Sequence, residues 1–160
     1  MSLLRSKIER TRFFKFLLVG ITGTIVDFGI LNLFRIVFHF PLIWSQAISF
    51  FCAVINNFLW NRYWTYPDSH DKRIHHQLVQ FFIINIIGIL IRTPLITWLD
   101  RVILTILNRV DLNFPIENYV LSQNIALTIS IVIILFWNFF ANRYWTYNNV
   151  PSEVNSNPDE

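Results

Sequence analysis

Four long apolar stretches dominate the pattern of hydrophobic and polar positions along the chain. They are Phe16–Phe34, Pro41–Trp60, Phe81–Leu99 and Tyr119–Phe140. At a helical rise of about 1.5 Å per residue, each stretch forms a helix about 30 Å long, which matches the hydrocarbon core of a bilayer. The stretches are continuous and do not alternate at every second position, which excludes a transmembrane β-barrel. We therefore predict an all-α membrane protein with four transmembrane helices.

The Lys and Arg residues are distributed unevenly between the two sides that these helices define. With a cytoplasmic amino terminus, nine of the 13 would lie inside: Arg5, Lys7, Arg10, Arg12, Lys15, Arg62, Lys72, Arg73 and Arg143. Only Arg35, Arg101 and Arg109 would lie outside. Because basic residues favour the cytoplasmic side, we expect a multi-pass protein of the inner membrane. Both termini would be cytoplasmic, and the loop 100–118 would lie outside.

The first apolar stretch has a second interpretation, because the basic residues before it resemble the start of a signal peptide. Its length, the absence of an A-x-A cleavage pattern and the three stretches that follow favour a helix that is retained.

The chain contains an internal repeat. Residues 57–66 read NFLWNRYWTY and residues 138–147 read NFFANRYWTY, which is eight identities in ten positions at an offset of 81. Upstream, at an offset of 65, Phe16, Gly23 and Asp27 align with Phe81, Gly88 and Arg92. The second hairpin is longer than the first, mostly because its predicted outer loop, residues 100–118, is longer than the corresponding loop 35–40. We expect two helical hairpins, about 13–66 and 78–147, related as parallel repeats by an axis along the membrane normal.

These hairpins form one predicted transmembrane domain, residues 16–147. A basic cytoplasmic segment, 1–15, precedes it. The polar, acidic residues 148–160 are predicted to form a disordered cytoplasmic tail.

The sequence resembles the GtrA-like family, small four-helix bacterial membrane proteins of surface-polysaccharide and cell-wall glycosylation. The stretch KFLLVG at residues 15–20, Asp27 and the two N-F-x-x-N-R-Y-W-T-Y stretches carry the resemblance, which covers about residues 12–147. It implies a role in moving, or helping to move, a polyprenyl-phosphate-linked sugar from the cytoplasmic leaflet to the outer one. Arg92 matches no motif of the family, so its role is argued from physical chemistry alone.

Two asparagines precede an arginine in each repeated motif. The residues are Asn57, Asn61 and Arg62 in the first repeat, and Asn138, Asn142 and Arg143 in the second. The asparagines of each pair share one helix face, and arginine binds phosphate oxygens with two parallel donors. We therefore predict that these six residues capture a lipid phosphate at the inner helix ends. In the alternative interpretation, the arginines are ordinary flanking charges that extend to the interface.

Aromatic residues also cluster in the two motifs: Tyr63, Trp64, Tyr66, Tyr144, Trp145 and Tyr147. They are expected to form the aromatic belt that membrane proteins place at the lipid interface.

Asp27 and Arg92 are the only charged residues within the apolar stretches, and each stands twelfth in its own stretch. Charged groups at such depth usually face the interior of a helix bundle and pair with each other. We expect a pair between these two residues. It would be either a structural ion pair or a second phosphate station.

Composition narrows the function further. Charged residues make up 14% of the chain, against about 25% in soluble domains. The pI of 9.3 follows from basic residues beside anionic lipid, so nucleic acid is not an expected partner.

Cys52 is alone and allows no redox pair. His70, His75 and His76 with two nearby aspartates are taken as a solvated loop, not a metal site.

No catalytic motif is present, so we expect neither an enzyme nor a cofactor. The favoured function is translocation of a polyprenyl-phosphate-linked sugar. The alternative is a non-transporting partner that positions a membrane glycosyltransferase. A proton-coupled drug exporter is disfavoured because Arg92 opposite Asp27 would lower the proton affinity of that carboxylate. Four helices make a thin wall for a large headgroup, so a homodimer is plausible.

Overall fold

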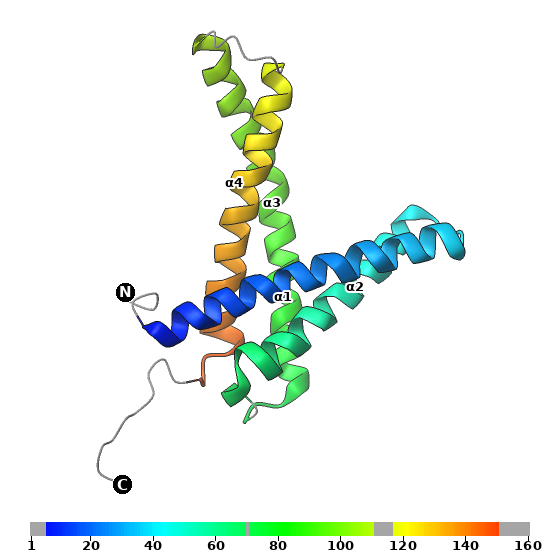
Figure 1. Ribbon diagram of the computed structural model, residues 1–160, viewed down its shortest axis with the longest axis vertical. Coiled ribbons are helices and arrows are strands. Elements are labelled where there is room, and N and C mark those ends of the chain that lie inside the picture. Colours follow the sequence, from blue (N-terminus) through cyan, green and yellow to red (C-terminus); the bar gives the residue numbers. More distant parts are fainter. Residues whose placement is uncertain (1–5, 70, 111–116, 151–160) are drawn as a thin grey trace. The chain divides into compact units, whose positions relative to one another are not determined.

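The computed structural model describes residues 6–69, 71–110 and 117–150. These residues form four long α-helices: α1 (Lys7–Asn32), α2 (Leu42–Trp60), α3 (Ile74–Val110) and α4 (Asn118–Ala141) (Figure 1). Short helical turns connect or extend them: η2 (Leu33–Val37), η3 (Asn61–Thr65), η4 (Pro67–Ser69) and η5 (Asn142–Thr146). The described ranges contain no strand, which confirms the all-α prediction.

Each α-helix, together with any turn that extends it, is long and apolar enough to cross a membrane. The four candidate spans are Lys7–Val37, Leu42–Thr65, Ile74–Val110 and Asn118–Thr146. Large apolar side chains stand on their outer faces, for example Phe28 at 70% and Ile43 at 73% exposure. Small polar residues are buried instead, including Ser49 and Ser130. This inverted pattern is typical of helices that pack through small residues and face lipid elsewhere.

The helices are longer than the apolar stretches. The segment 1–15, expected as a basic flank, is helical from Lys7, and residues 1–5 lie outside the described part. The prediction of an outer loop over residues 100–118 is wrong for residues 100–110, which continue α3. At 37 residues, α3 is roughly 55 Å long, well beyond a hydrocarbon core. Hydropathy marks only the lipid-facing part of a helix, whereas backbone hydrogen bonding continues into polar sequence.

The chain divides into two compact units. The first contains α1, α2, the start of α3 up to Phe82 and the segment from Asn142 onward. Its core brings Val54, Phe58, Phe81 and Val150 together with two tyrosines of the repeated motifs. Val150 is 3% exposed, so the predicted disordered tail is wrong at its first described residues. Residues 151–160 lie outside the described part.

The second unit consists of Ile83–Ala141, the rest of α3 with α4. Ser122 Oγ on α4 donates to Asp100 Oδ1 on α3 at 2.6 Å. Near the other end of this pair, the Trp137 indole donates to the backbone oxygen of Ile84 at 3.4 Å. These bonds connect the two helices as an antiparallel hairpin.

A glycine of one helix faces an asparagine of its neighbour in each hairpin. A Cβ atom at Gly23 would stand 2.2 Å from Asn57 Oδ1. At the equivalent Gly88 it would stand 3.2 Å from Asn138 Oδ1. The glycines let the helices approach closely, and the amides fill the space that remains. Asn57 and Asn138 therefore lie in the seams of their hairpins.

Candidate functional site

The two repeated motifs adopt the same unusual backbone. In each, the residues N-R-Y-W-T form a π-helical turn, η3 or η5. The turn is closed by a hydrogen bond from the following tyrosine, Tyr66 N to Asn61 O and Tyr147 N to Asn142 O, both 2.8 Å. Such turns are rare and often occur at functional sites. The sequence showed the repetition of these residues but not this backbone.

The motif arginines are buried and hold the chain that follows each helix. Arg143, at 6% exposure, donates from Nη1 to Tyr147 O at 2.8 Å and from Nη2 to Val150 O at 2.9 Å. Arg62, at 5% exposure, donates from Nη1 to Ser69 O at 3.5 Å. Ser69 and Val150 stand at equivalent places, seven residues after each arginine. Both motifs therefore use their arginine to fix the segment beyond the π-helical turn.

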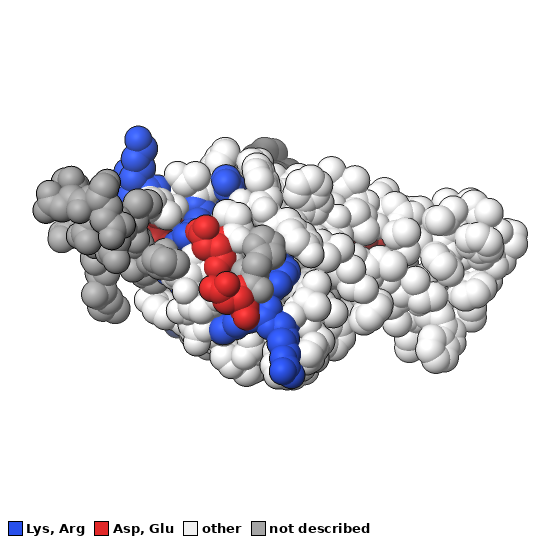
Figure 2. All heavy atoms as spheres, turned by 90° about the horizontal axis from the view of Figure 1, so that it is seen from below, with Lys and Arg blue, Asp and Glu red and all other residues white. Residues whose placement is uncertain are grey.

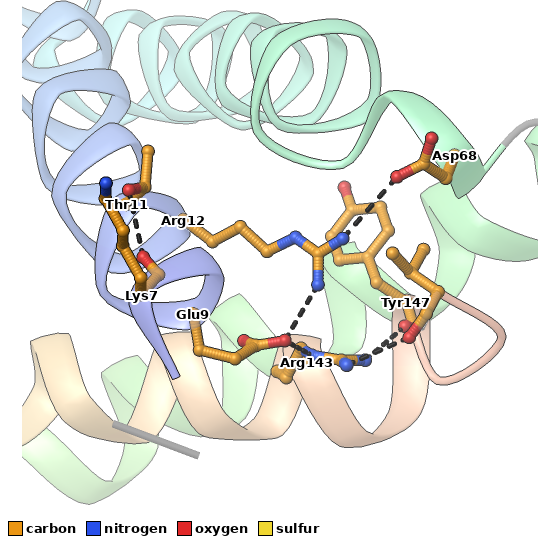
Figure 3. A network of polar contacts seen from close by, with 8 residues as sticks. Lys7, Glu9, Thr11, Arg12, Asp68, Arg143 and Tyr147 are labelled. Atoms are coloured by element: carbon orange, nitrogen blue, oxygen red, sulfur yellow. Dashed lines mark hydrogen bonds and ion pairs between the residues drawn. The ribbon is translucent and has the colours of Figure 1, made fainter. Parts of the chain in front are cut away.

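A fully buried glutamate of α1 completes this network (Figure 3). Glu9 Oε1 accepts from Arg143 Nε at 3.0 Å and from Arg12 Nη1 at 2.8 Å. Arg12 Nη2 also lies 3.5 Å from Oδ2 of Asp68, which belongs to η4. One carboxylate thus joins the beginning of α1 to η5.

Sequence reasoning missed both Glu9 and Arg12, because the first 15 residues were interpreted only as a basic flank. One signal was present. Glu9 is the only acidic residue among these 15, and Arg12 follows it by one helical turn.

The last tyrosine of each motif is buried, which corrects the expectation of an aromatic belt at these two positions. Tyr66 and Tyr147 are 0% exposed, and their rings stack with centroids 4.2 Å apart. Burial raises the pKa of both phenols well above the usual value, and the Glu9 carboxylate raises that of Tyr66 further. The two repeats therefore meet through a pair of neutral rings.

The other four motif aromatics are exposed. Their exposed fractions lie between 39% and 63% for Tyr63, Trp64, Tyr144 and Trp145. A role for them at the lipid interface stays a prediction.

The motif asparagines make local contacts. Asn61 Nδ2 donates to Asn57 O at 2.9 Å, and Asn142 Oδ1 accepts from Thr146 Oγ1 at 2.9 Å. Asn57 and Asn138 pack against the glycines described above. These contacts, with those of Arg62 and Arg143, favour an internal structural role. Phosphate capture by the six motif residues stays a prediction, and a phosphate at the arginines would have to compete with their protein partners.

Asp27 and Arg92 lie in different units. Asp27 is half-buried on α1 and Arg92 is exposed on α3. Within its own unit, neither forms an ion pair with another described residue. A pair between the two stays a prediction.

A pocket of about 340 Å³ opens between the first turns of α1 and the η3–η4 segment. Its polar lining comes from Lys7, Thr11, Arg12, Lys15, Thr65 and Asp68. In Figure 2, charged side chains gather over part of the visible face, while much of the rest carries almost none. The described residues contain no cluster of metal-ligating side chains, and His70 lies outside them.

Two comparisons with known proteins bear on this arrangement. The sequence model of the GtrA/DPMS transmembrane domain matches residues 15–147. The "Uncharacterized membrane protein YngA" of Bacillus subtilis (strain 168) is 32% identical over 72 residues, which is 45% of this chain and 47% of that protein. The match thus spans about half the length of that relative.

Proposed function

Because the chain belongs to the GtrA/DPMS transmembrane-domain family, we propose that it moves a polyprenyl-phosphate-linked sugar across the membrane for polysaccharide or cell-wall glycosylation. The observation that carries the proposal is the family match, which covers all four candidate membrane spans apart from the first turns of α1. The family match indicates a membrane protein of glycosylation, and translocation is the finer step that we add. Moving a lipid needs polar groups along the path of its headgroup, and needs no bond-making residues.

Reconstitution of the purified full chain into vesicles tests this proposal. We expect the protein to carry a fluorescent short-chain polyprenyl-phosphate sugar from one leaflet to the other, measured by reduction of the fluorophore from outside. Protein-free vesicles give the background rate. Equal rates in the two preparations would contradict translocation by this protein alone.

A second function is favoured by the internal role of the repeated motif. Arg62 and Arg143 bond to the protein's own carbonyl oxygens. The motif would then be a structural scaffold in a non-transporting partner of a membrane glycosyltransferase. In that case, the vesicles would show no flipping above the background, and the protein would instead raise the activity of the glycosyltransferase reconstituted with it. Anionic lipids and a second copy of the chain are further proposed partners.

We also propose that both termini lie on the cytoplasmic side of the inner membrane. Lys and Arg residues are concentrated at the helix ends of that side, where anionic lipid attracts them. In a Cys52→Ala background, an Arg109→Cys variant should react with an impermeant maleimide added outside spheroplasts. An Asp71→Cys variant should react only after lysis. The reverse pattern would overturn the orientation.

A further inference from the structure

We propose that the pocket between α1 and the η3–η4 segment binds the phosphate of a lipid-linked sugar, with Lys7 and Lys15 holding the phosphate and Asp68 accepting a sugar hydroxyl. The inference rests on the proposed function, because it takes its substrate class from there. It assigns the phosphate to residues outside the repeated arginines.

The cationic groups that line the pocket differ in whether a carboxylate of the protein already compensates their charge. The Arg12 guanidinium is buried, at 7% exposure, and faces the carboxylates of Glu9 and Asp68. Its charge is therefore compensated within the protein. Lys7 is exposed, and Lys15 Nζ donates to Trp64 O at 3.1 Å, which leaves further donors on the ammonium group. The two lysines are thus the groups that can bind an added anion.

A buried hydroxyl at the pocket has no partner in the described part of the chain. Thr65 is 1% exposed, lines the pocket, and its Oγ1 makes no hydrogen bond to a described residue. A buried hydroxyl without a partner costs about 1–3 kcal/mol, so such groups usually serve a ligand or an ordered water. A phosphate oxygen bound in the pocket would accept from it.

The second repeat shows that the missing partner of this hydroxyl is not imposed by the motif. Thr146, the equivalent of Thr65, donates to Asn142 Oδ1 at 2.9 Å. In the first repeat, the oxygen of the corresponding asparagine, Asn61 Oδ1, is likewise buried without a partner among the described residues. The two side chains therefore bond to each other in the second repeat, whereas in the first repeat both groups lack a partner among the described residues, and Thr65 lines the pocket.

Most charges of the pocket belong to the first repeat alone, although Lys7 aligns with Lys72. At the offsets of 65 and 81 residues, the equivalents of Arg12, Lys15 and Asp68 are Gln77, Gln80 and Asn149. The two copies keep the π-helical turn and its arginine, but only the first has this combination of cations and a carboxylate. Structural needs common to both repeats do not account for that difference.

Two features favour a lipid that carries a sugar over a free phosphate. Lys15 Nζ lies 5.5 Å from the ring centroid of Trp64, an exposed aromatic of the kind found at lipid interfaces. Asp68 would repel a bare phosphate, yet its carboxylate accepts hydrogen bonds from hydroxyl groups. A headgroup that carries both a phosphate and sugar hydroxyls can place the phosphate beside the lysines and a hydroxyl beside Asp68.

Binding of defined probes to the full chain in zwitterionic nanodiscs tests the site. The probes are farnesyl phosphate, farnesyl-phosphoryl-glucose, glucose 1-phosphate and farnesol. We expect Lys7→Gln and Lys15→Gln each to weaken binding of both farnesyl phosphates about tenfold, the usual effect of losing one charge-assisted hydrogen bond. Arg10→Gln is the matched control, because Arg10 is an exposed cation of the same helix that does not line the pocket.

Asp68→Asn separates the sugar from the phosphate. It should strengthen binding of farnesyl phosphate, because repulsion is removed, and should leave farnesyl-phosphoryl-glucose unchanged or weaker. Thr65→Val should weaken both. Thermal unfolding of each variant in detergent shows whether the fold is retained, and a retained fold is expected for the exposed Lys7 and Asp68.

The outcomes distinguish this site from the proposed function. Wild-type affinity for farnesyl phosphate no greater than for farnesol, or lysine variants that bind like Arg10→Gln, would overturn the site even if the protein flips lipid. Equal affinity for glucose 1-phosphate and farnesyl-phosphoryl-glucose would overturn its assignment to a lipid. Lysine-dependent binding without flipping by the wild type would support the site and contradict translocation.

Discussion

Replacing Glu9 by glutamine is expected to lower the free energy of unfolding by about 3–5 kcal/mol, the usual cost of removing one partner from a buried ion pair. The carboxylate is fully buried and accepts from Arg12 and Arg143 at 2.8 and 3.0 Å. Glutamine keeps the size and one oxygen but not the charge. Two guanidinium groups would then stay buried with less compensation.

The measurement is unfolding of the purified protein in mixed micelles titrated with a denaturing detergent. Arg10→Gln, an exposed change one residue away, should stay within about 0.5 kcal/mol of the wild type. A double variant, Glu9→Gln with Arg12→Gln, should be less destabilised than the sum of the two single variants, because each removes the other's unpaired charge. Additive effects would show that the Glu9–Arg12 contact carries little energy.

Truncating Tyr147 to alanine should lower the free energy of unfolding by about 3–5 kcal/mol, the range for removing a large aromatic side chain from a core. The ring is fully buried, stacks on Tyr66 and packs in the core of the first unit. The change leaves a cavity at the place where the two repeated motifs meet.

Tyr147→Phe is the internal control for that variant. The Tyr147 hydroxyl has no hydrogen-bond partner among the described residues, so its removal should be neutral or slightly stabilising. The same micelle titration compares the two variants. If Tyr147→Phe lowered the free energy of unfolding as much as Tyr147→Ala does, the hydroxyl and not the ring would carry the stability.

Stability and phosphate binding must be measured separately for the motif arginines. Arg143 bonds to Tyr147 O, Val150 O and Glu9, and a lysine cannot reproduce this planar set of donors. Loss of transport in Arg143→Lys would therefore follow from the fold alone. The pocket lysines take no part in the ion pairs of Glu9 with Arg12 and Arg143, so their variants separate ligand binding from the stability of that network.

The sequence by itself determined the membrane-spanning architecture. Runs of about 20 apolar residues have few alternatives to a transmembrane helix, because an unsatisfied backbone in lipid is costly. The near-identical motifs at 57–66 and 138–147 likewise showed that the chain repeats and where the equivalent residues lie. Both features are local, so they could be read before any tertiary contact was known.

Tertiary structure decided which polar residues are buried and with whom they pair. Glu9 and Arg143 are 134 positions apart, and no periodicity along the chain connects them. The same holds for the stacking of Tyr66 on Tyr147 and for the pocket, whose lining comes from α1 and from the residues after α2. Hydropathy reports the average surroundings of a helix, whereas a buried charge depends on one partner brought to it by the fold. For this reason the motif arginines, interpreted from sequence as ligands for a phosphate, are found holding the chain's own carbonyl groups.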